Sequence, residues 1–420
     1  MTEQQASTPP AASLSFRKKL LFFCFFNLFL VVALFGGLEY LARSIQARRL
    51  GPRSTEPQAL RDRFTAWRNN PKFGRVDIQH NAQGFRREGD VAEEKPPGTV
   101  RIFLLGGSAA YGCEGLYPEI EDRFKRIYNN QLIDHFLELK LNAAYPARRW
   151  EVINAATNEF RMHQHQTLIQ AVLLRYRPDY IVFMDGHNDI SGLLLMGPEP
   201  YDPYAETPHL DEFEYLANPQ TPGSFRVFFF TWLRARSVFF RTAQDWLEAR
   251  ANRTRRSDAV TAPRQASVPV KASELTAEEQ AQAGKALRQA GYYAMAARRI
   301  HRILQLASVR PVFLLQPQLI LSRKPPTETE KKLAAFHRVT KGPLFIYAYE
   351  QLYPEIARQM NEAAQQDGFH FLSLVDVFDR APEQAFSDYC HLTPDGNGII
   401  ADRIIEFMKD EFAALAAGKK

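Results

Sequence analysis

The feature that most constrains this fold is an alternation of short apolar runs with longer amphipathic segments, which continues from residue 100 to the C-terminus. The apolar runs are Val100–Leu105, Trp150–Ile153, Asp179–Met184, Pro311–Leu315 and Phe369–Leu372. The helical patterns between and after them are Pro118–Leu141, His163–Tyr176, Ala277–Leu306, Phe345–Gln366 and Asp395–Leu415. Short buried strands separated by helices indicate parallel βαβ units. We therefore predict an α/β fold, a three-layer α/β/α flavodoxin-like sandwich with a five-stranded parallel sheet and a ligand site at the carboxyl ends of its strands.

The composition argues against nucleic-acid, metal and cofactor binding. The 420 residues are 45% hydrophobic and 24% charged, enough for a full core, and the formal net charge is +6. The basic residues are spread along the chain without a nucleic-acid-binding motif, so we expect no nucleic-acid partner. The three cysteines (Cys24, Cys113 and Cys390) form no CxxC pair, so we expect no zinc site and no other metal. The chain has no glycine-rich phosphate cradle, and we expect no cofactor.

The N-terminal region contains a long apolar segment. Leu20–Leu38 is apolar apart from Asn27 and follows a basic cluster. At about 1.5 Å per residue, this length just crosses a hydrocarbon core of about 30 Å. A cleaved signal peptide is the alternative, but only a poor cleavage site follows, around Ala47. We predict an uncleaved transmembrane helix.

The orientation of this helix is left open by the charges around it. Basic residues precede the apolar segment and others follow it, which would naively keep the C-terminal domain in the cytoplasm. Long domains cross membranes largely regardless of such charges, and the basic stretch could equally lie on anionic headgroups.

The predicted organisation has three parts. Residues 1–42 form an N-terminal tail and the anchor, residues 43–98 a juxtamembrane linker, and residues 99–420 the main domain. The main domain carries an insertion over about 192–272.

Within the insertion, Phe225–Leu247 is a predicted helix with an aromatic stripe and several arginines. We favour packing of this stripe against the domain's own core, with a lid or a membrane-surface contact as the alternatives. Gly197–Pro222 is predicted to be an irregular excursion, and the polar Arg250–Ser273 a mobile loop.

Polar residues follow three of the apolar runs. Ser108 comes after two glycines at the end of the first run, Asn188 follows the third, and Asp388 and His391 follow the fifth. Asp and His three residues apart can place a carboxylate on the imidazole, leaving the other nitrogen as a base. An asparagine can donate to an oxyanion, although it could also cap a helix or form a turn. Meeting at one sheet edge, these groups would suffice for acyl transfer through a serine ester.

These motifs resemble the SGNH hydrolase (GDSL-like) family, in its membrane-anchored bacterial form. The first block is LLGGSAAYG, in which Gly107 replaces the family's usual aspartate. Further matches are GHND from Gly186, DYCHLTPDGN from Asp388, and NAQGFR ahead of the serine block. The resemblance covers most of the chain from about Val100. It implies a catalytic triad of Ser108, Asp388 and His391.

The second block departs from the family pattern. It reads NAATNE, so that Glu159 occupies the place of a glycine whose backbone N–H joins the oxyanion hole. A backbone N–H survives any residue except proline, but a Glu side chain beside an oxyanion must turn away. We therefore expect Asn188, Gly186 and Glu159 to form the oxyanion and substrate-binding side of the site.

Three functions are compatible with this pattern. The first is hydrolysis of an O-acyl group on an envelope glycan or lipid through an acyl-enzyme. The second is transfer of an acyl group to a carbohydrate by the same triad, and the third is a non-catalytic binding or assembly role. Anchored relatives act outside the cytoplasm, so we expect a single-pass protein of the bacterial inner membrane with a periplasmic domain. The oligomeric state is left open.

The remaining candidates have structural explanations. His163 and His165 should lie on different helix faces without a carboxylate cluster, which argues against metal binding. His187 is expected to line the pocket, and Gln316 could contact substrate at the end of the fourth run.

Cys113 and Cys390 lie close in sequence to the serine and the histidine. If those two side chains meet, the cysteines share a neighbourhood, either as a disulfide in an oxidising compartment or as two free thiols.

Overall fold

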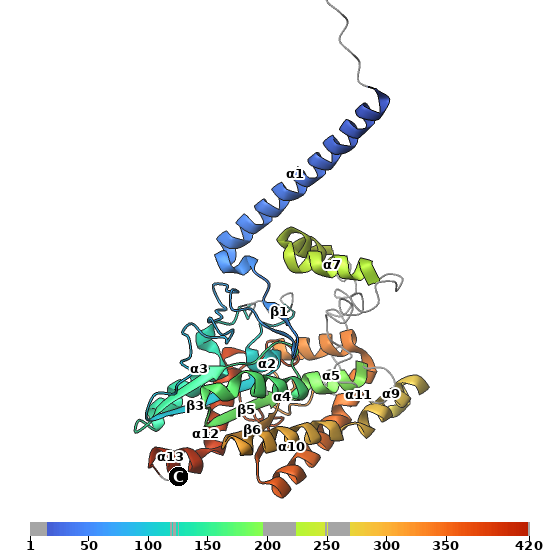
Figure 1. Ribbon diagram of the computed structural model, residues 1–420. Coiled ribbons are helices and arrows are strands. Elements are labelled where there is room, and N and C mark those ends of the chain that lie inside the picture. The colour runs from blue at the N-terminus through green and yellow to red at the C-terminus, as the bar shows by residue number, and fades with distance from the viewer. Residues whose placement is uncertain are drawn as a thin grey trace, which may run out of the picture.

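A long N-terminal helix stands away from an α/β domain in the computed structural model of the chain (Figure 1). The residues that the structure describes are 15–117, 120, 123–124, 126–195, 224–247, 250 and 269–418. The predicted excursion at 197–222 lies outside them, as does most of the predicted loop at 250–273.

The domain is built on one sheet of five parallel strands. They lie side by side in the order β4-β3-β5-β6-β7. Their bounds are β3 (Thr99–Gly106), β4 (Arg149–Asn154), β5 (Tyr180–Asp185), β6 (Arg310–Leu315) and β7 (His370–Ser373). Counted along the domain this is the order 2-1-3-4-5, which is that of flavodoxin-like folds. The predicted three-layer fold and its five strands are confirmed.

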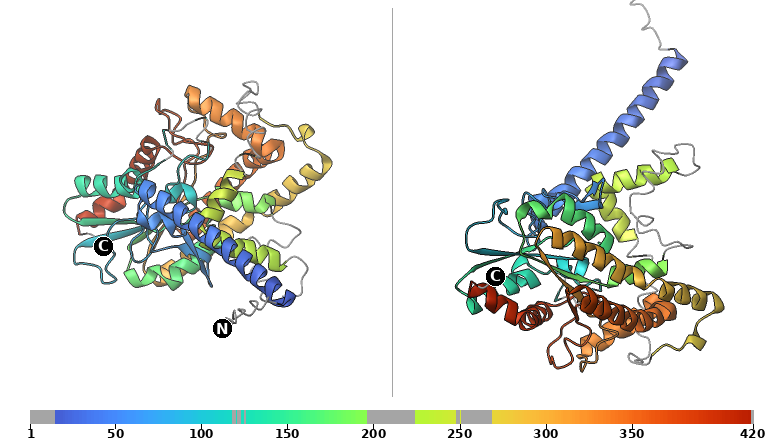
Figure 2. Two further views of the ribbon diagram at one scale, coloured as in Figure 1. Left: turned by 90° about the horizontal axis from the view of Figure 1, so that it is seen from above. Right: turned by 60° about the horizontal axis from the view of Figure 1, so that its bottom comes forward.

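Helices cover both faces of the sheet, and the alternation of side chains along β3 assigns each face. Ile102 and Leu104 belong to one buried cluster, whereas Phe103 and Leu105 belong to the other. The first cluster is closed by α3 (Ile133–Ala144), α12 (Pro394–Phe407) and α13 (Lys409–Ala416). The second is closed by α4 (Met162–Ala171), α5 (His187–Leu195), α9 (Ala277–Arg288), α10 (Gly291–Leu306) and the second part of α11 (Glu328–Asp367), and the first part of α11 packs in the first cluster. The views in Figure 2 show the same layering from two other sides.

Several predicted helices have different bounds. The helix expected from Pro118 begins only at Ile133. Ahead of this helix, Asn129–Gln131 form a short 3-10 helix, and the carbonyl of Ile127 accepts a hydrogen bond from the Arg86 side chain (2.6 Å). The predicted helix at 277–306 is two helices. The helix predicted from Phe345 matches the second part of α11, which begins at Glu328 and is interrupted by a non-helical residue, Gly342 (φ +79°). The start of α11 is a capping box, in which the Thr327 hydroxyl accepts a bond from the amide of Glu330 (3.2 Å).

The segment between the apolar helix and β3 packs against the domain. It contains a small antiparallel hairpin, β1 (Ala59–Asp62) and β2 (Ala66–Asn69), which sequence patterns did not reveal. Phe73 and Phe85 from this segment are buried in the two clusters on the sheet faces. The residues predicted to be a juxtamembrane linker thus contribute to the core, and the three-part division of the chain remains a prediction.

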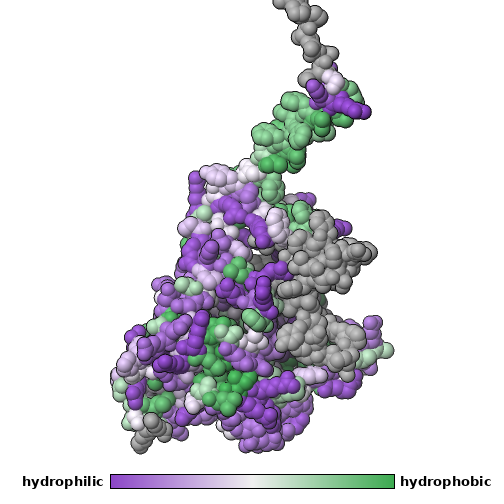
Figure 3. Space-filling view, viewed as in Figure 1, coloured by the Kyte–Doolittle hydropathy of each residue, from purple (hydrophilic) through white to green (hydrophobic). Residues whose placement is uncertain are grey.

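Helix α1 (Phe16–Leu50) contains the predicted apolar segment and continues twelve residues beyond Leu38. Among the described residues it is the one helix long and apolar enough to cross a membrane, and an 18-residue window within it has a mean hydropathy of 2.5. No residue of α1 is buried. Its apolar surface contrasts with the largely hydrophilic face of the domain seen in Figure 3.

Two short helices from the insertion lie beside α1. The first is α7 (Ser224–Arg236), and a second helical stretch follows it over residues 238–247 after a break at Ser237. The single helix predicted over Phe225–Leu247 is thus broken once. Figure 1 and the two views of Figure 2 place α7, in yellow-green, next to the domain-proximal half of α1.

Candidate active site

Ser108 lies at the carboxyl end of β3, where the chain turns into the four-residue helix α2 (Ser108–Tyr111). Gly106 makes this turn with φ +150°, and a Cβ there would lie 2.6 Å from the Ala110 Cβ and collide with the Met184 carbonyl. Only glycine fits so close to the neighbouring strand β5. The turn places Ser108 at the sheet edge with its side chain partly exposed.

Ser108, His391 and Asp388 form a hydrogen-bonded chain. His391 Nε2 lies 2.7 Å from Ser108 Oγ, and His391 Nδ1 lies 2.6 Å from Asp388 Oδ2. Asp388 is fully buried, and its Oδ1 accepts the backbone amides of Cys390 and His391 at 2.8 Å each. The carboxylate therefore fixes both the loop and the imidazole ring, which leaves Nε2 to serve the serine hydroxyl.

The pKa values of this pair move in opposite directions. Burial alone would raise the pKa of Asp388, but the adjacent His391 and the backbone amides hold it well below its ordinary value. Burial alone would lower the pKa of His391, but the Asp388 carboxylate raises it well above its ordinary value. The acid stays ionised, and the imidazole takes up a proton more readily than a free histidine does.

Esterase activity is accordingly expected to rise with pH as His391 loses its proton, because only the neutral ring can accept the proton of Ser108. Since the pKa of His391 is raised, the midpoint of kcat/KM against pH should lie above about 6.5, the value of an unperturbed histidine. Initial rates on p-nitrophenyl acetate across a pH series measure this midpoint. In Asp388→Asn the residual activity should show a midpoint at lower pH. A wild-type midpoint below that of free histidine would contradict the assignment.

Asn188 faces this chain from the neighbouring strand end. Helix α5 starts at His187, one residue ahead of Asn188, so Asn188 does not occupy the capping position considered above. Its Nδ2 donates to the carbonyl of Phe160 (3.0 Å) and lies against Gly107, where a Cβ would collide with it. One hydrogen of the Asn188 amide is thus used in the bond to Phe160. The amide lies beside Gly107, the residue before Ser108.

Glu159 adopts the backbone conformation that glycine favours. Its φ is +64°, in the left-handed region, and its side chain is exposed. Glu159 thus holds a backbone conformation that glycine would adopt without strain. Gly186, with φ +129°, directly follows β5, and its carbonyl accepts the amide of Ile190 in the first turn of α5. Gly186 therefore orients Asn188 through the backbone.

The hairpin supports the loop that contains Glu159. Trp67 Nε1 donates to the carbonyl of Asn158 (2.9 Å), and Asn69 Nδ2 donates to the carbonyl of Ala156 (2.9 Å). Residues from the segment that leaves α1 therefore hold one wall of the site.

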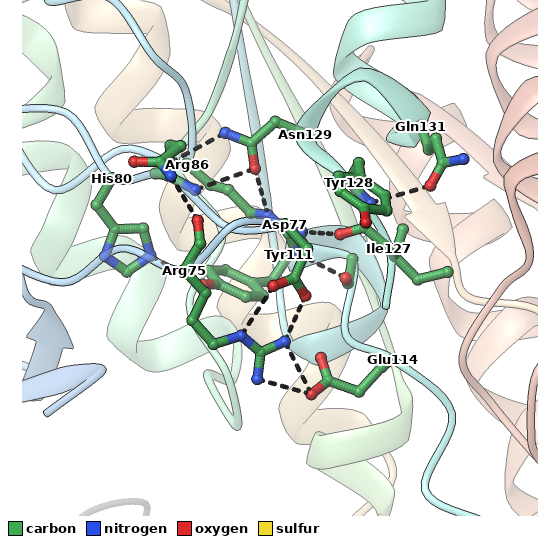
Figure 4. Close-up of polar contacts among 12 residues, drawn as sticks. Arg75, Asp77, His80, Arg86, Tyr111, Glu114, Ile127, Tyr128, Asn129 and Gln131 are labelled. Atoms are coloured by element: carbon green, nitrogen blue, oxygen red, sulfur yellow. Dashed lines mark hydrogen bonds and ion pairs between the residues drawn. The ribbon is translucent and has the colours of Figure 1, made fainter. Parts of the chain in front are cut away.

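Arg86 is a further residue of the site's framework, and sequence reasoning gave it no role. Its guanidinium is buried, with 1% of the residue exposed, and it donates to the carbonyls at the end of the serine helix. The acceptors are Tyr111 (2.9 Å), Gly112 (2.6 Å) and Ile127 (2.6 Å). Figure 4 shows this cluster, with Asn129 accepting from Nε. A cation at the carbonyl end of a helix is favourable, and here it ties α2 to two other loops.

We expect Arg86→Ala to destabilise the fold by at least about 3 kcal/mol, because each buried carbonyl left unpaired costs roughly 1–3 kcal/mol. Denaturant unfolding of the detergent-solubilised chain, followed by tryptophan emission, measures this loss. Arg87→Ala is the matched control: its ion pair with Glu151 is long (3.9 Å), and it should cost less than about 1 kcal/mol. Equal losses in the two variants would contradict the role of Arg86.

Two other polar residues support the strand ends. Gln316 Nε2 donates to the carbonyl of Cys390 (3.2 Å), so it holds the histidine loop, and only 3% of it is exposed. Asn154 bridges the carbonyl of Ala110 (3.0 Å) and the Asp134 carboxyl (2.9 Å). Burial raises the pKa of Asp134 to about 7.

The three other histidines singled out by the sequence lie in buried surroundings of their own. His187 is buried against Tyr389 and bonded to the Tyr349 hydroxyl (2.8 Å), and burial lowers its pKa to about 3. His165 Nε2 contacts Asp185 (3.1 Å) beneath the site. Burial also lowers the pKa of His163 to about 3.

The cysteines are thiols in this structure. Cys113 Sγ donates to the side chain of Asn158 (3.1 Å), and Cys390 is buried. The alternatives for Cys113 and Cys390 were a disulfide and two free thiols, and the structure has the free thiols. Among the described residues, Cys390 with Asp388 and His391 forms the one group whose ligand atoms, all within 4.8 Å, could hold a metal. Both carboxylate oxygens and both ring nitrogens of this group already make hydrogen bonds.

Comparison with known proteins adds little. No protein-family model matches the chain, and no curated protein does. Similar solved structures include an α/β hydrolase from the metagenome of Lake Arreo, Spain (13% identity, 74% of this chain and 95% of that one, TM-score 0.34). Others are the acetyl xylan esterase AlAXEase (9%, 73% and 98%, 0.35) and an acetylxylan esterase of Geobacillus stearothermophilus (10%, 74% and 94%, 0.35). At such scores the likeness carries no weight, and the fold rests on the strand order described above.

Proposed function

We propose that this chain is a serine ester hydrolase of the SGNH type, which removes an O-acyl group from an envelope glycan or lipid through an acyl-enzyme. The single observation that carries the proposal is the unbroken contact chain from the partly exposed Ser108 Oγ through His391 to the buried Asp388. A nucleophile, an oriented base and a buried acid are what acyl transfer through serine requires.

In the proposed reaction, Ser108 Oγ attacks the ester carbonyl while His391 Nε2 takes its proton. Asp388 stays ionised and stabilises the imidazolium. The Asn188 amide and the backbone N–H groups of Ser108 and Glu159 would donate hydrogen bonds to the carbonyl oxygen. These bonds would stabilise the negative charge that develops on it. The proton then passes to the leaving alcohol as the acyl-enzyme forms. A water molecule, activated by the same His391, releases the acid and restores Ser108.

We also propose that α1 remains attached as a single-pass anchor in the bacterial inner membrane, with the domain on the periplasmic side. Two observations favour an anchor over a cleaved signal. The only weak cleavage position, Ala47, lies inside the continuous helix α1. The end of α1 also bonds to the domain, since the Gln46 side chain donates to the carbonyl of Ser54 and the amide of Val76 to that of Leu50 (2.9 Å). The intact mass of the membrane-extracted protein distinguishes the two.

A fluorophosphonate probe tests the hydrolase proposal directly. The wild-type chain should be labelled on Ser108, and Ser108→Ala should not be labelled. Ser191→Ala is the matched control, because Ser191 follows β5 on α5 but bonds to the Tyr349 hydroxyl (2.9 Å), and it should label as the wild type does. Absence of labelling in a folded wild-type chain would sink the proposal. Acetate released from an acetylated oligosaccharide, with and without an added sugar acceptor, separates hydrolysis from transfer.

A further inference from the structure

The insertion presents aromatic side chains to solvent next to the apolar helix. On α7, Phe229, Phe230 and Trp232 are 41%, 44% and 39% exposed. On the following helical stretch, Trp246 and Leu247 are each 57% exposed. Aromatic residues of this size are ordinarily buried, so an exposed group of them indicates a contact surface.

Arginines accompany these rings. Arg226 lies over the ring of Phe230 (5.9 Å), Arg236 over Trp232 (5.0 Å) and Arg250 over Trp246 (5.5 Å). Tryptophan with arginine is the composition of helices that lie in a lipid headgroup region, where the rings face the acyl boundary and the cations face phosphates.

The helix pair is fastened to α1 by a specific contact. Glu39, the only acidic residue of α1, accepts the Ser237 hydroxyl (2.7 Å) and the amides of Val238 and Phe239 (3.0 Å each). Its carboxylate thus pairs the free amides where the second helical stretch begins. The Arg43 side chain also donates to the carbonyl of Arg236 (2.7 Å), at the end of α7.

The position of this contact places the pair at the membrane surface. Glu39 directly follows the apolar segment that ends at Leu38, and Phe35, inside that segment, packs edge-on against Phe239 (6.1 Å). When α1 lies in a bilayer, the helix pair is therefore held where the apolar segment emerges from the hydrocarbon.

We propose that α7 and the helical stretch at 238–247 form a membrane-surface contact, which lies in the headgroup region of anionic phospholipid beside α1. This surface is separate from the chemistry of Ser108, although it rests on α1 being a membrane anchor. It would hold the domain to the bilayer at a second point and restrict its rotation about the single anchor.

Tryptophan quenching by brominated phospholipid tests the proposal on the full chain. Bromine atoms quench only rings that they contact, and the two remaining tryptophans, Trp67 and Trp150, are 8% and 1% exposed within the domain. In vesicles of phosphatidylcholine and phosphatidylglycerol, brominated lipid should quench the wild type. The double variant Trp232→Phe/Trp246→Phe should lose most of this quenching, whereas Trp67→Phe should keep it. Quenching should also weaken in vesicles of phosphatidylcholine alone, where arginine has no anionic lipid to contact.

Equal quenching of the double variant and the wild type would overturn the proposal, and so would its absence in the wild type. Flotation of the same vesicles after alkaline carbonate washing shows separately whether α1 is inserted. A chain that stays with the vesicles but shows no quenching refutes the surface contact alone, and fluorophosphonate labelling of the same sample reports on the hydrolase site independently.

Discussion

Replacing Ser108 by alanine should lower kcat for p-nitrophenyl acetate by at least about three orders of magnitude, and so should replacing His391 by alanine. Ser108 supplies the oxygen atom that becomes acylated. This oxygen lies at hydrogen-bond distance, 2.7 Å, from His391 Nε2. His391 removes the proton that would otherwise make the attacking oxygen a poor nucleophile. Steady-state kinetics of the purified variants, normalised to folded protein, measure both losses.

The double variant sharpens this test. Because the two side chains act as a unit, Ser108→Ala/His391→Ala should be hardly slower than either single variant. Additive losses would show two independent contributions, and full activity in either single variant would remove the serine mechanism. Ser191→Ala should keep its activity, because its hydroxyl is bonded to Tyr349 rather than to a base.

Asn188→Ala should lower kcat by about two to three orders of magnitude while KM changes little, which is the usual result of removing one oxyanion donor. The amide lies against Gly107, with one hydrogen given to the Phe160 carbonyl, so the second is available to charge that develops beside Ser108. Binding of the neutral substrate needs no such donor. The substitution therefore removes stabilisation of the transition state and lowers kcat without weakening substrate binding.

A purely structural role for Asn188 gives a different result. Loss of the bond to Phe160 alone would lower the free energy of unfolding by about 1 kcal/mol and leave activity per folded molecule intact. Asn361→Ala is a suitable control, since that side chain bonds only to its own helix at Ala357 (2.9 Å) and should change neither quantity.

The strands and the triad positions could be predicted because they depend on local patterns. Each strand is a short apolar run, and parallel strands bring their carboxyl ends to one edge whatever their order. Ser108 and His391, 283 residues apart, could therefore be placed together without knowledge of the loops between them. Their catalytic roles remain predictions until the variants are measured.

The framework around the site could not be predicted in the same way. Arg86 is a charged residue in a polar stretch, and only its tertiary surroundings of carbonyl oxygens make burial favourable. The hairpin was missed because its strands are short and alternate weakly, and its stability comes from contacts such as that of Trp67 with the loop at Asn158. The helix expected from about Pro118 begins only at Ile133, and the bond from Arg86 to the Ile127 carbonyl ahead of it is another tertiary contact that a local pattern does not reveal.

The contact between Gly107 and Asn188 also constrains how this chain can evolve. Any Cβ at position 107 would occupy the place of the Asn188 Nδ2 atom, and the short amide side chain could give way only by turning from Ser108. An aspartate at position 107 would therefore displace the amide in the same step. This chain can accept a side chain at position 107 only together with a compensating change around α5, so positions 107 and 188 can change only as a pair.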